Sequence, residues 1–173
     1  IAVWDALSPI RPDMAIFTNR DALRVCEGLR DILIPVEWAE DKKSHAKARD
    51  MLRQTSNAFE QGRAVVLFPS GRLAAWDKKK KALQERPWQP TLITLARKYD
   101  VPIIPLKMTA RNSPFFYFLS GMSNELRDIT LFHELLNKKD SHWRLEFGSP
   151  IAPEILSGDP RQEVARLQAL CTA

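Results

Sequence analysis

Short apolar runs alternate with amphipathic segments along the chain, and this alternation limits the folds that are open to it. Runs with strand character lie at residues 14–17, 32–36, 64–68, 101–108 and 143–147. Segments with helical periodicity lie at residues 1–7, 44–60, 90–99, 124–137 and 161–171. Because such alternation favours a sheet covered by helices, we expect an α/β fold with a mixed, largely parallel sheet flanked by helices. No linker divides the chain, so we expect residues 1–173 to form a single domain.

Three segments rich in proline, lysine or aromatic residues call for separate expectations within this fold. Pro102 and Pro105 lie in the run at residues 101–108, so that strand is expected at a sheet edge or after a bulge. Residues 72–87 are rich in lysine and are expected to form a loop. The run FFYFL at residues 115–119 is expected to be buried, with a bilayer-facing surface as the alternative. It is far shorter than the roughly 20 apolar residues that a membrane-spanning helix needs.

The most informative segment follows the apolar run at residues 64–68. It reads Phe68-Pro69-Ser70-Gly71-Arg72. Ligands of α/β proteins bind beyond the carboxyl ends of strands, where loops expose backbone amides. Proline ends the strand, glycine allows close backbone approach to a ligand, and the arginine fork suits phosphate. The segment predicts a small phosphate pocket, while the same residues also fit a tight turn whose arginine points into water.

Three sequence blocks, taken in order, resemble those of the PlsC-like lysophospholipid acyltransferases. That family carries FPEGTR after a buried strand and a VPIIPV-like block one helix later. This chain has FPSGR at residues 68–72 and VPIIPL at residues 101–106. Its FGSPI at residues 147–151 resembles the family's G-x-P-I strand exit. The resemblance extends from Ile1 to about Leu156.

The resemblance implies an acyltransferase with a lipid acceptor. A fatty acyl group would pass from a thioester, either acyl-CoA or acyl-carrier protein, to the free hydroxyl of a lysolipid such as a lysophospholipid. The protein would need no metal or redox cofactor and would work peripherally at the cytoplasmic face of a membrane. Its substrate-binding residues would be Phe68, Pro69, Ser70, Gly71, Arg72 and, from a looser match to the family's second block, Arg20.

Two departures from the family pattern bear on the acceptor. Ser70 stands where the family has glutamate, and the threonine before the arginine is missing. In the family this region helps to hold the glycerol phosphate of the acceptor. Arg72 and the backbone of Ser70 and Gly71 are expected to hold an anionic head group. Because of the two departures, the acceptor stays open between lysophosphatidate, a lyso-aminolipid and other lysolipids.

The catalytic motif of the family is HxxxxD, whose histidine acts as general base while the aspartate orients the imidazole. A literal match runs from His45 to Asp50, inside the predicted helix at residues 44–60. There a five-residue offset turns the second side chain by about 140° from the first, so the two cannot act together. We interpret the match as coincidental. His133 and His142, in a helix and a polar turn, are not expected to act as bases either.

Residues 1–7 resemble the remainder of the helix that carries HxxxxD at its start. We therefore expect the catalytic histidine and aspartate in a segment that precedes Ile1, so that residues 1–173 form an N-terminally incomplete acyltransferase domain. A protein without such a segment would instead be a non-catalytic, acyltransferase-like lipid-binding domain.

The net charge of +5 favours an anionic partner. The four lysines at residues 78–81 fit a solvated loop, or contacts with coenzyme A phosphates, an acidic carrier protein or anionic head groups. Trp76 and Trp88 are candidate interfacial anchors or core residues. A nucleic-acid-binding module is the weaker alternative, because the aromatic residues do not interleave with the basic ones as stacking platforms would. Cys26 and Cys171 lie far apart and predict neither a metal site nor a disulfide framework.

Overall fold

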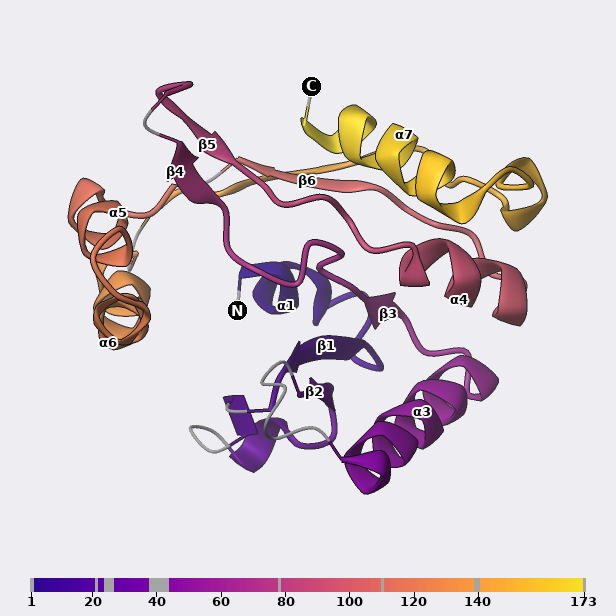
Figure 1. The fold of residues 1–173 in the computed structure, drawn as a ribbon. Coiled ribbons are helices and arrows are strands. Elements are labelled where there is room, and N and C mark those ends of the chain that lie inside the picture. Colours follow the sequence, from indigo (N-terminus) through magenta and orange to yellow (C-terminus); the bar gives the residue numbers. More distant parts are fainter. Residues whose placement is uncertain are drawn as a thin grey trace. The chain divides into compact units, whose positions relative to one another are not determined.

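The chain divides into an N-terminal unit, Ile1–Phe68, and a C-terminal unit, Pro69–Ala173 (Figure 1). The computed structural model describes residues 2–20, 22–23, 27–37, 44–77, 79–109, 111–138 and 141–172. Of the residues singled out above, Ile1, Cys26 and Lys78 lie outside the described residues. Helices and strands alternate through both units, and the mixed α/β class with a parallel sheet and flanking helices is confirmed.

A three-stranded parallel sheet forms the centre of the N-terminal unit. Its strand order is β2 (Leu33–Val36), β1 (Ala15–Asn19), β3 (Val65–Val66). Ile16 of the central strand pairs with Leu33 on one side and with Val66 on the other. The apolar run at residues 64–68 thus pairs as a strand over only two residues, and the chain has left the sheet by the end of that run.

The two faces of this sheet are covered by different segments, because successive strand residues point to opposite sides. On one face Ala15 and Ile34 pack against Ala58 of α3 (His45–Glu60). On the other face Met14 and Ile16 pack with apolar residues that flank the sheet. Those flanking residues come from α1 (Ala2–Leu7), from the short helix η1 (Glu27–Leu29) and from the segments around them. Both faces of the sheet are therefore apolar, as the sequence predicts for a central parallel sheet.

The bounds of α3 follow from its caps. Ser44 accepts a hydrogen bond from the backbone nitrogen of Lys47 and caps the first turn. Gly62, with φ +66°, takes the left-handed conformation that ends a helix. The helix predicted at residues 44–60 is confirmed.

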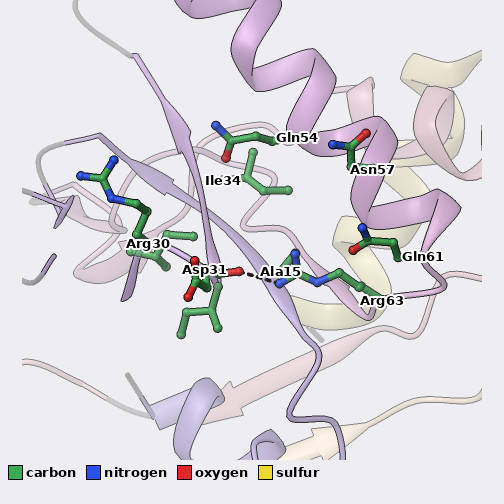
Figure 2. Close-up of a pocket in the computed structure, with 10 residues that line it drawn as sticks. Ala15, Arg30, Asp31, Ile34, Gln54, Asn57, Gln61 and Arg63 are labelled. Carbon is green, nitrogen blue, oxygen red and sulfur yellow. Dashed lines mark hydrogen bonds between the residues drawn. The ribbon is translucent and has the colours of Figure 1, made fainter. Parts of the chain in front are cut away.

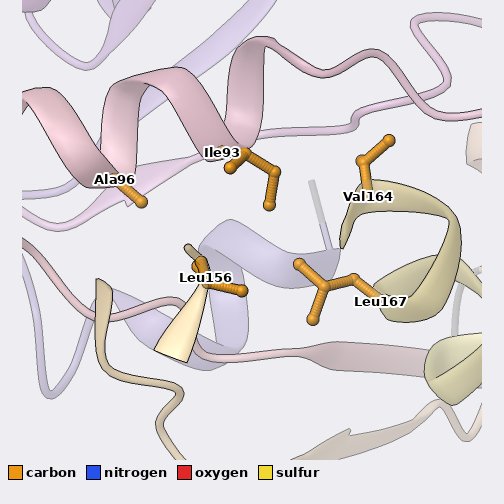
Figure 3. Packing of buried hydrophobic residues seen from close by; sticks show 5 residues of the cluster. All are labelled: Ile93, Ala96, Leu156, Val164 and Leu167. Carbon is orange, nitrogen blue, oxygen red and sulfur yellow. The ribbon is translucent and has the colours of Figure 1, made fainter. Parts of the chain in front are cut away.

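The core of the C-terminal unit lies between two helices. Ile93 and Ala96 of α4 (Thr91–Tyr99) pack against Val164 and Leu167 of α7 (Pro160–Thr172), with Leu156 between them (Figure 3). Leu156 directly follows the short helix η3 (Pro153–Ile155). Arg97 fixes this turn by donating to the carbonyl oxygens of Leu156 and of Gly158, the latter at 2.6 Å.

The strands of the C-terminal unit form two antiparallel pairs. β6 (Leu106–Thr109) pairs with β7 (Arg144–Phe147), and begins only after Pro105, as expected from a residue that cannot donate to a strand ladder. The segment at residues 72–87 contains a hairpin of β4 (Ala75–Asp77) and β5 (Ala82–Gln84), so the prediction of a loop throughout this segment is wrong. Asp77, which accepts from two backbone nitrogens in the turn, gives this lysine-rich segment its regular structure.

A helical hairpin completes the C-terminal unit, formed by α5 (Pro114–Ser120) and α6 (Asn124–Asn137). The apolar run at residues 115–119 lies in α5, where only Phe116 is fully buried. Phe115 and Phe118 keep 56% and 67% of their surface exposed, so the expected burial is wrong for these two residues. A helix turns side chains of one continuous apolar run to different sides, which is why the run did not stay buried as a whole. None of the helices in the described ranges combines the length and hydropathy of a bilayer-spanning segment.

Candidate functional site

Two of the predicted binding segments leave the parallel sheet at one edge. Arg20 directly follows β1, and Phe68 lies two residues after β3. β1 and β3 are neighbours and run parallel, so their carboxyl ends meet at the same edge. This is the edge at which α/β sheets bind ligands.

Arg20 is anchored by its backbone and carries an unsatisfied donor. Its backbone nitrogen donates to the carbonyl oxygen of Val36, at the end of β2, over 3.0 Å. Its Nε is buried and has no hydrogen-bond partner among the residues that the structure describes. Since buried donors are normally satisfied, this nitrogen is a candidate for contact with an oxygen of a ligand.

The loop after Phe68 turns sharply at Gly71, whose φ of +64° lies in the left-handed region that favours glycine. Ser70 is buried, and its Oγ lies 3.0 Å from the carbonyl oxygen of Arg72 and 3.3 Å from Oε1 of Glu85. The hydroxyl has one proton to share between these acceptors. Ser70 therefore holds the turn closed across Gly71 and ties it to the segment after β5.

Glu85 connects the loop to the start of α4, and the sequence alone did not reveal it. Its Oε2 accepts from Nε1 of Trp88 at 2.9 Å, while Gln89 donates its backbone nitrogen to the carbonyl oxygen of Pro69 at 3.0 Å. Glu85 thus places a carboxylate beside Ser70. Ser70 is the residue that occupies the position of the family's glutamate. It lies 15 residues from Ser70 in the chain and belongs to no motif, so only the structure brings the two together.

Arg72 presents an exposed guanidinium next to this closed turn. Its side chain forms neither a hydrogen bond nor an ion pair with any residue in the described part of the chain. A planar fork of five donors on a fixed turn is suited to a phosphate or carboxylate group. Phe68, at the other end of the loop, is also exposed.

His45 and Asp50 lie on an ordinary helix surface. His45 is the exposed first residue of α3, whereas the two carboxylate oxygens of Asp50 accept from Arg53 at 3.0 Å and from Gln54 at 2.9 Å. The carboxylate of Asp50 is thus engaged by neighbours in its own helix. His133 and His142 are exposed as well.

A polar cavity of about 160 Å³ lies in the N-terminal unit, at the amino ends of the strands (Figure 2). Arg63 lines it and donates to the carbonyl oxygens of Asp13 at 2.7 Å, Met14 at 2.9 Å and Asp31 at 2.8 Å. These bonds tie together the starts of β1 and β2. The cavity lies at the edge opposite Arg20 and Phe68. Both of its arginines already have partners, because Arg63 binds the three carbonyls and Arg30 pairs with Glu27.

A second cavity, of about 410 Å³, lies in the C-terminal unit between the start of α4 and α7. Its wall is largely apolar, with Trp88 and Val164 among its residues and Arg161 as its cation. Gln168 closes one side by accepting from the backbone nitrogen of Trp88 at 3.1 Å and donating to the carbonyl oxygen of Arg86 at 3.0 Å. Trp88 connects this cavity to the Ser70 turn through Glu85.

The segment Phe68–Arg72 follows a parallel strand of an α/β fold, as the resemblance to the acyltransferases implies. The chain belongs to the Acyltransferase family, whose model matches residues 2–109. The matched segment contains the parallel sheet, the loop at Phe68–Arg72 and the VPIIPL block.

Two curated relatives are similar over most of this chain. It is 24% identical to the lyso-glycine lipid O-acyltransferase of Phocaeicola vulgatus over 137 residues, which cover 76% of this chain and 47% of that protein. It is 22% identical to the lyso-glycine lipid O-acyltransferase of Bacteroides thetaiotaomicron over 137 residues, which cover 76% of this chain and 48% of that protein. The chain therefore spans about half the length of the curated relatives it matches. No solved structure matches it.

Proposed function

We propose that the protein transfers a fatty acyl group from a thioester donor to the free hydroxyl of a lysolipid. The observation that carries this proposal is the Ser70–Gly71–Arg72 turn after β3, inside the segment that matches the Acyltransferase family. The similarity to two lyso-glycine lipid O-acyltransferases supports a lipid acceptor of the lyso-aminolipid kind. The donor is acyl-CoA or acyl-carrier protein.

The proposed reaction exchanges a thioester for an ester. The hydroxyl oxygen of the acceptor forms a bond with the acyl carbonyl carbon, and the carbon–sulfur bond breaks. A histidine takes the hydroxyl proton and returns it to the departing thiolate, so the step needs no other reactant. Histidine suits both transfers because its unperturbed pKa of about 6.5 lies near neutral pH. We propose that this histidine and its aspartate belong to an HxxxxD block that precedes Ile1 in the full-length protein.

The described residues have binding roles in this proposal. Arg72 holds the anionic head group of the acceptor, and the Gly71 turn fixes the direction in which the guanidinium leaves the backbone. Ser70 and Glu85 keep the turn closed, which makes them positioning residues. Arg20, whose buried Nε has no partner among the described residues, is proposed as a further donor to a substrate oxygen.

Acyl transfer by the purified full-length protein tests the proposal. Lyso-glycine lipid and lysophosphatidate are compared as acceptors, each with acyl-CoA and with acyl-carrier protein. We expect Arg72→Ala to raise the KM for the acceptor by about tenfold or more, since a charge-assisted hydrogen bond contributes roughly 1.5–3 kcal/mol. Arg72→Lys should recover part of the loss, and the matched control Arg49→Ala, an exposed cation of α3, should leave KM unchanged.

Replacing the histidine of the HxxxxD block by alanine tests the chemical step itself. The variant should lose acyl transfer while still binding lysolipid. Activity retained in this variant would overturn the mechanism. A full-length protein that binds lysolipid but transfers no acyl group to either acceptor would instead be a non-catalytic, lipid-binding relative.

A further inference from the structure

The β4–β5 hairpin carries a cluster of exposed lysines at its tip. Asp77 shapes the turn, because its Oδ1 accepts from the backbone nitrogens of Lys79 at 2.8 Å and Lys80 at 3.0 Å. Lys79, Lys80 and Lys81 are all exposed. None of the three ammonium groups pairs with a carboxylate in the described ranges, and Lys80 donates instead to the neutral Oε1 of Gln84 at 3.0 Å. The hairpin therefore presents three exposed ammonium groups on an ordered turn, and the carboxylate of Asp77 lies within electrostatic range of Lys80.

Exposed aromatic side chains lie on the hairpin and on the helix beside it. β4 lies against α5 within the C-terminal unit (Figure 1). Trp76 of β4 is 47% exposed, and Phe115 and Phe118 of α5 are 56% and 67% exposed. Phe115 and Phe118 are three residues apart and share one helix face, while Phe116 holds the opposite face in the interior. Large aromatic groups gathered on neighbouring elements indicate an interaction surface.

Lysines combined with exposed tryptophan and phenylalanine fit one kind of partner best. Lysines near an anionic leaflet are attracted by its surface potential, and tryptophan sits favourably at the level of the lipid head groups. Phenylalanine on a helix face gains by entering the boundary of the acyl chains. An acidic protein would also match the lysines, and a contribution of the aromatic groups to vesicle binding that persists at high salt separates a bilayer from such a partner.

We propose that the β4–β5 tip and the exposed face of α5 form a docking surface for an anionic lipid bilayer. The proposal deepens the proposed function, since it gives the protein a way to reach a lysolipid in a membrane. Both elements belong to the C-terminal unit, and α5 lies outside the segment that matches the family.

Vesicle binding by the full-length protein tests the docking surface. The probes are phosphatidylcholine vesicles with and without phosphatidylglycerol. The lysine variant is Lys79→Gln with Lys80→Gln, and its matched control is Arg49→Gln with Lys98→Gln, which removes two exposed charges elsewhere. We expect the lysine variant to bind anionic vesicles on the order of tenfold more weakly, from the attraction of each lysine near a charged leaflet. The difference should shrink as salt is raised, and the control should bind like the wild type.

A second variant tests the aromatic part of the surface. Trp76→Ala with Phe115→Ala and Phe118→Ala should weaken binding to both kinds of vesicle, and the loss should persist at high salt. Because Trp76 and Phe115 each bury about half of their surface, binding is compared at a temperature at which circular dichroism shows both the variant and the wild type to be folded. If the lysine variant and the aromatic variant both bound vesicles as tightly as the wild-type protein, the proposal would be overturned.

Two further measurements separate docking from catalysis. Acyl transfer to lysolipid in detergent solution should be unchanged in the lysine and aromatic variants. If the lysine variant instead raised the KM for acyl-CoA or for acyl-carrier protein, the lysines would serve the donor and the proposal would be wrong. A protein that docks on vesicles as expected but transfers no acyl group would contradict the proposed function and leave the docking surface intact.

Discussion

Arg63 shows how one side chain can define the start of a sheet. Its guanidinium donates to three backbone carbonyls, from Asp13, Met14 and Asp31, that precede two adjacent strands. These carbonyls lie before the first paired residues of β1 and β2. A single planar donor group therefore fixes the register of β1 against β2 at the amino end.

We expect Arg63→Ala to lower the free energy of unfolding by roughly 2 kcal/mol, because it leaves several carbonyls of a half-buried site without donors. Urea denaturation checks this value. Arg53→Ala, which removes an exposed ion pair with Asp50, should cost less than about 0.5 kcal/mol. Equal losses in the two variants would show that the Arg63 bonds do not hold the strands.

Gly71 is the residue on which the geometry of the binding loop depends. Alanine at its φ of +64° is strained by roughly 1 kcal/mol or more. We expect Gly71→Ala to reduce kcat/KM by about tenfold, because the Ser70 bond across the turn lengthens and Arg72 leaves in another direction. Steady-state kinetics measures this effect.

Gly62 provides the matched control for this prediction. Its φ of +66° is nearly the same, and an added Cβ there would meet no atom within 4 Å. Gly62→Ala should therefore bring a similar strain without the loss of activity. Gly71→Asn should recover part of the activity, since asparagine tolerates the left-handed region better than alanine. If Gly62→Ala were as inactive as Gly71→Ala, general destabilisation would explain both.

At the scale of elements, the α5–α6 hairpin is held by a buried carboxylate. Oε2 of Glu134 accepts from the backbone nitrogen of Ser113 at 2.8 Å and from Nζ of Lys138 at 3.0 Å. Its Oε1 accepts from the hydroxyl of Ser113. Burial by itself raises the pKa of Glu134, but the bonds from Ser113 and the charge of Lys138 together leave that pKa below its ordinary value.

The lowered pKa of Glu134 predicts that the hairpin loosens in acid. A carboxyl whose pKa is lower in the folded state contributes stability that is complete above its unfolded pKa of about 4.3. That contribution disappears as the pH falls through the folded pKa. Hydrogen exchange of α5 and α6 should accelerate over this range in the wild type.

Glu134→Gln should already show fast exchange of these helices at pH 7, with little further change as the pH falls below the unfolded pKa. Glu60→Gln, at an exposed carboxylate of α3, should behave like the wild type. Identical pH profiles for wild type and Glu134→Gln would contradict the assignment.

At the scale of the whole molecule, each unit has its own buried apolar cluster. Ile34 belongs to the cluster beneath α3, and Ile93 belongs to the cluster between α4 and α7. We expect Ile34→Ala and Ile93→Ala each to cost on the order of 2–5 kcal/mol. Hydrogen exchange should accelerate in β1 and α3 for the first variant and in α4 and α7 for the second. Acceleration throughout both units in either variant would show that the chain unfolds as one cooperative body.

The sequence predicted those parts of the fold in which local pattern and tertiary packing agree. The helix at residues 44–60 has a polar cap, a periodic apolar face and a terminal glycine, and it forms as expected. The parallel sheet followed from continuous apolar runs. The segment at residues 68–72 follows β3 in the chain, and its binding role stays a prediction.

The missed features depend on interactions that local patterns do not encode. The β4–β5 hairpin has too few apolar residues to show alternation, and its turn is made by backbone bonds to Asp77. Glu85 and Ser70 meet only because the segment after β5 returns to the loop. The exposure of Phe115 and Phe118 depends on which face of α5 packs inward, and a uniformly aromatic run does not show this.

The turn of the β4–β5 hairpin is formed by hydrogen bonds from backbone nitrogens to Asp77, so its geometry does not require positively charged side chains. The aspartate binds the backbone nitrogens of Lys79 and Lys80, which any residue with a backbone N–H provides, while the ammonium group of Lys80 adds a hydrogen bond to Gln84. Substitutions at these two positions can make the tip neutral or acidic while the hairpin persists. The affinity of the protein for one surface or another can therefore be retuned, by evolution or by engineering, without rebuilding the scaffold that carries the tip.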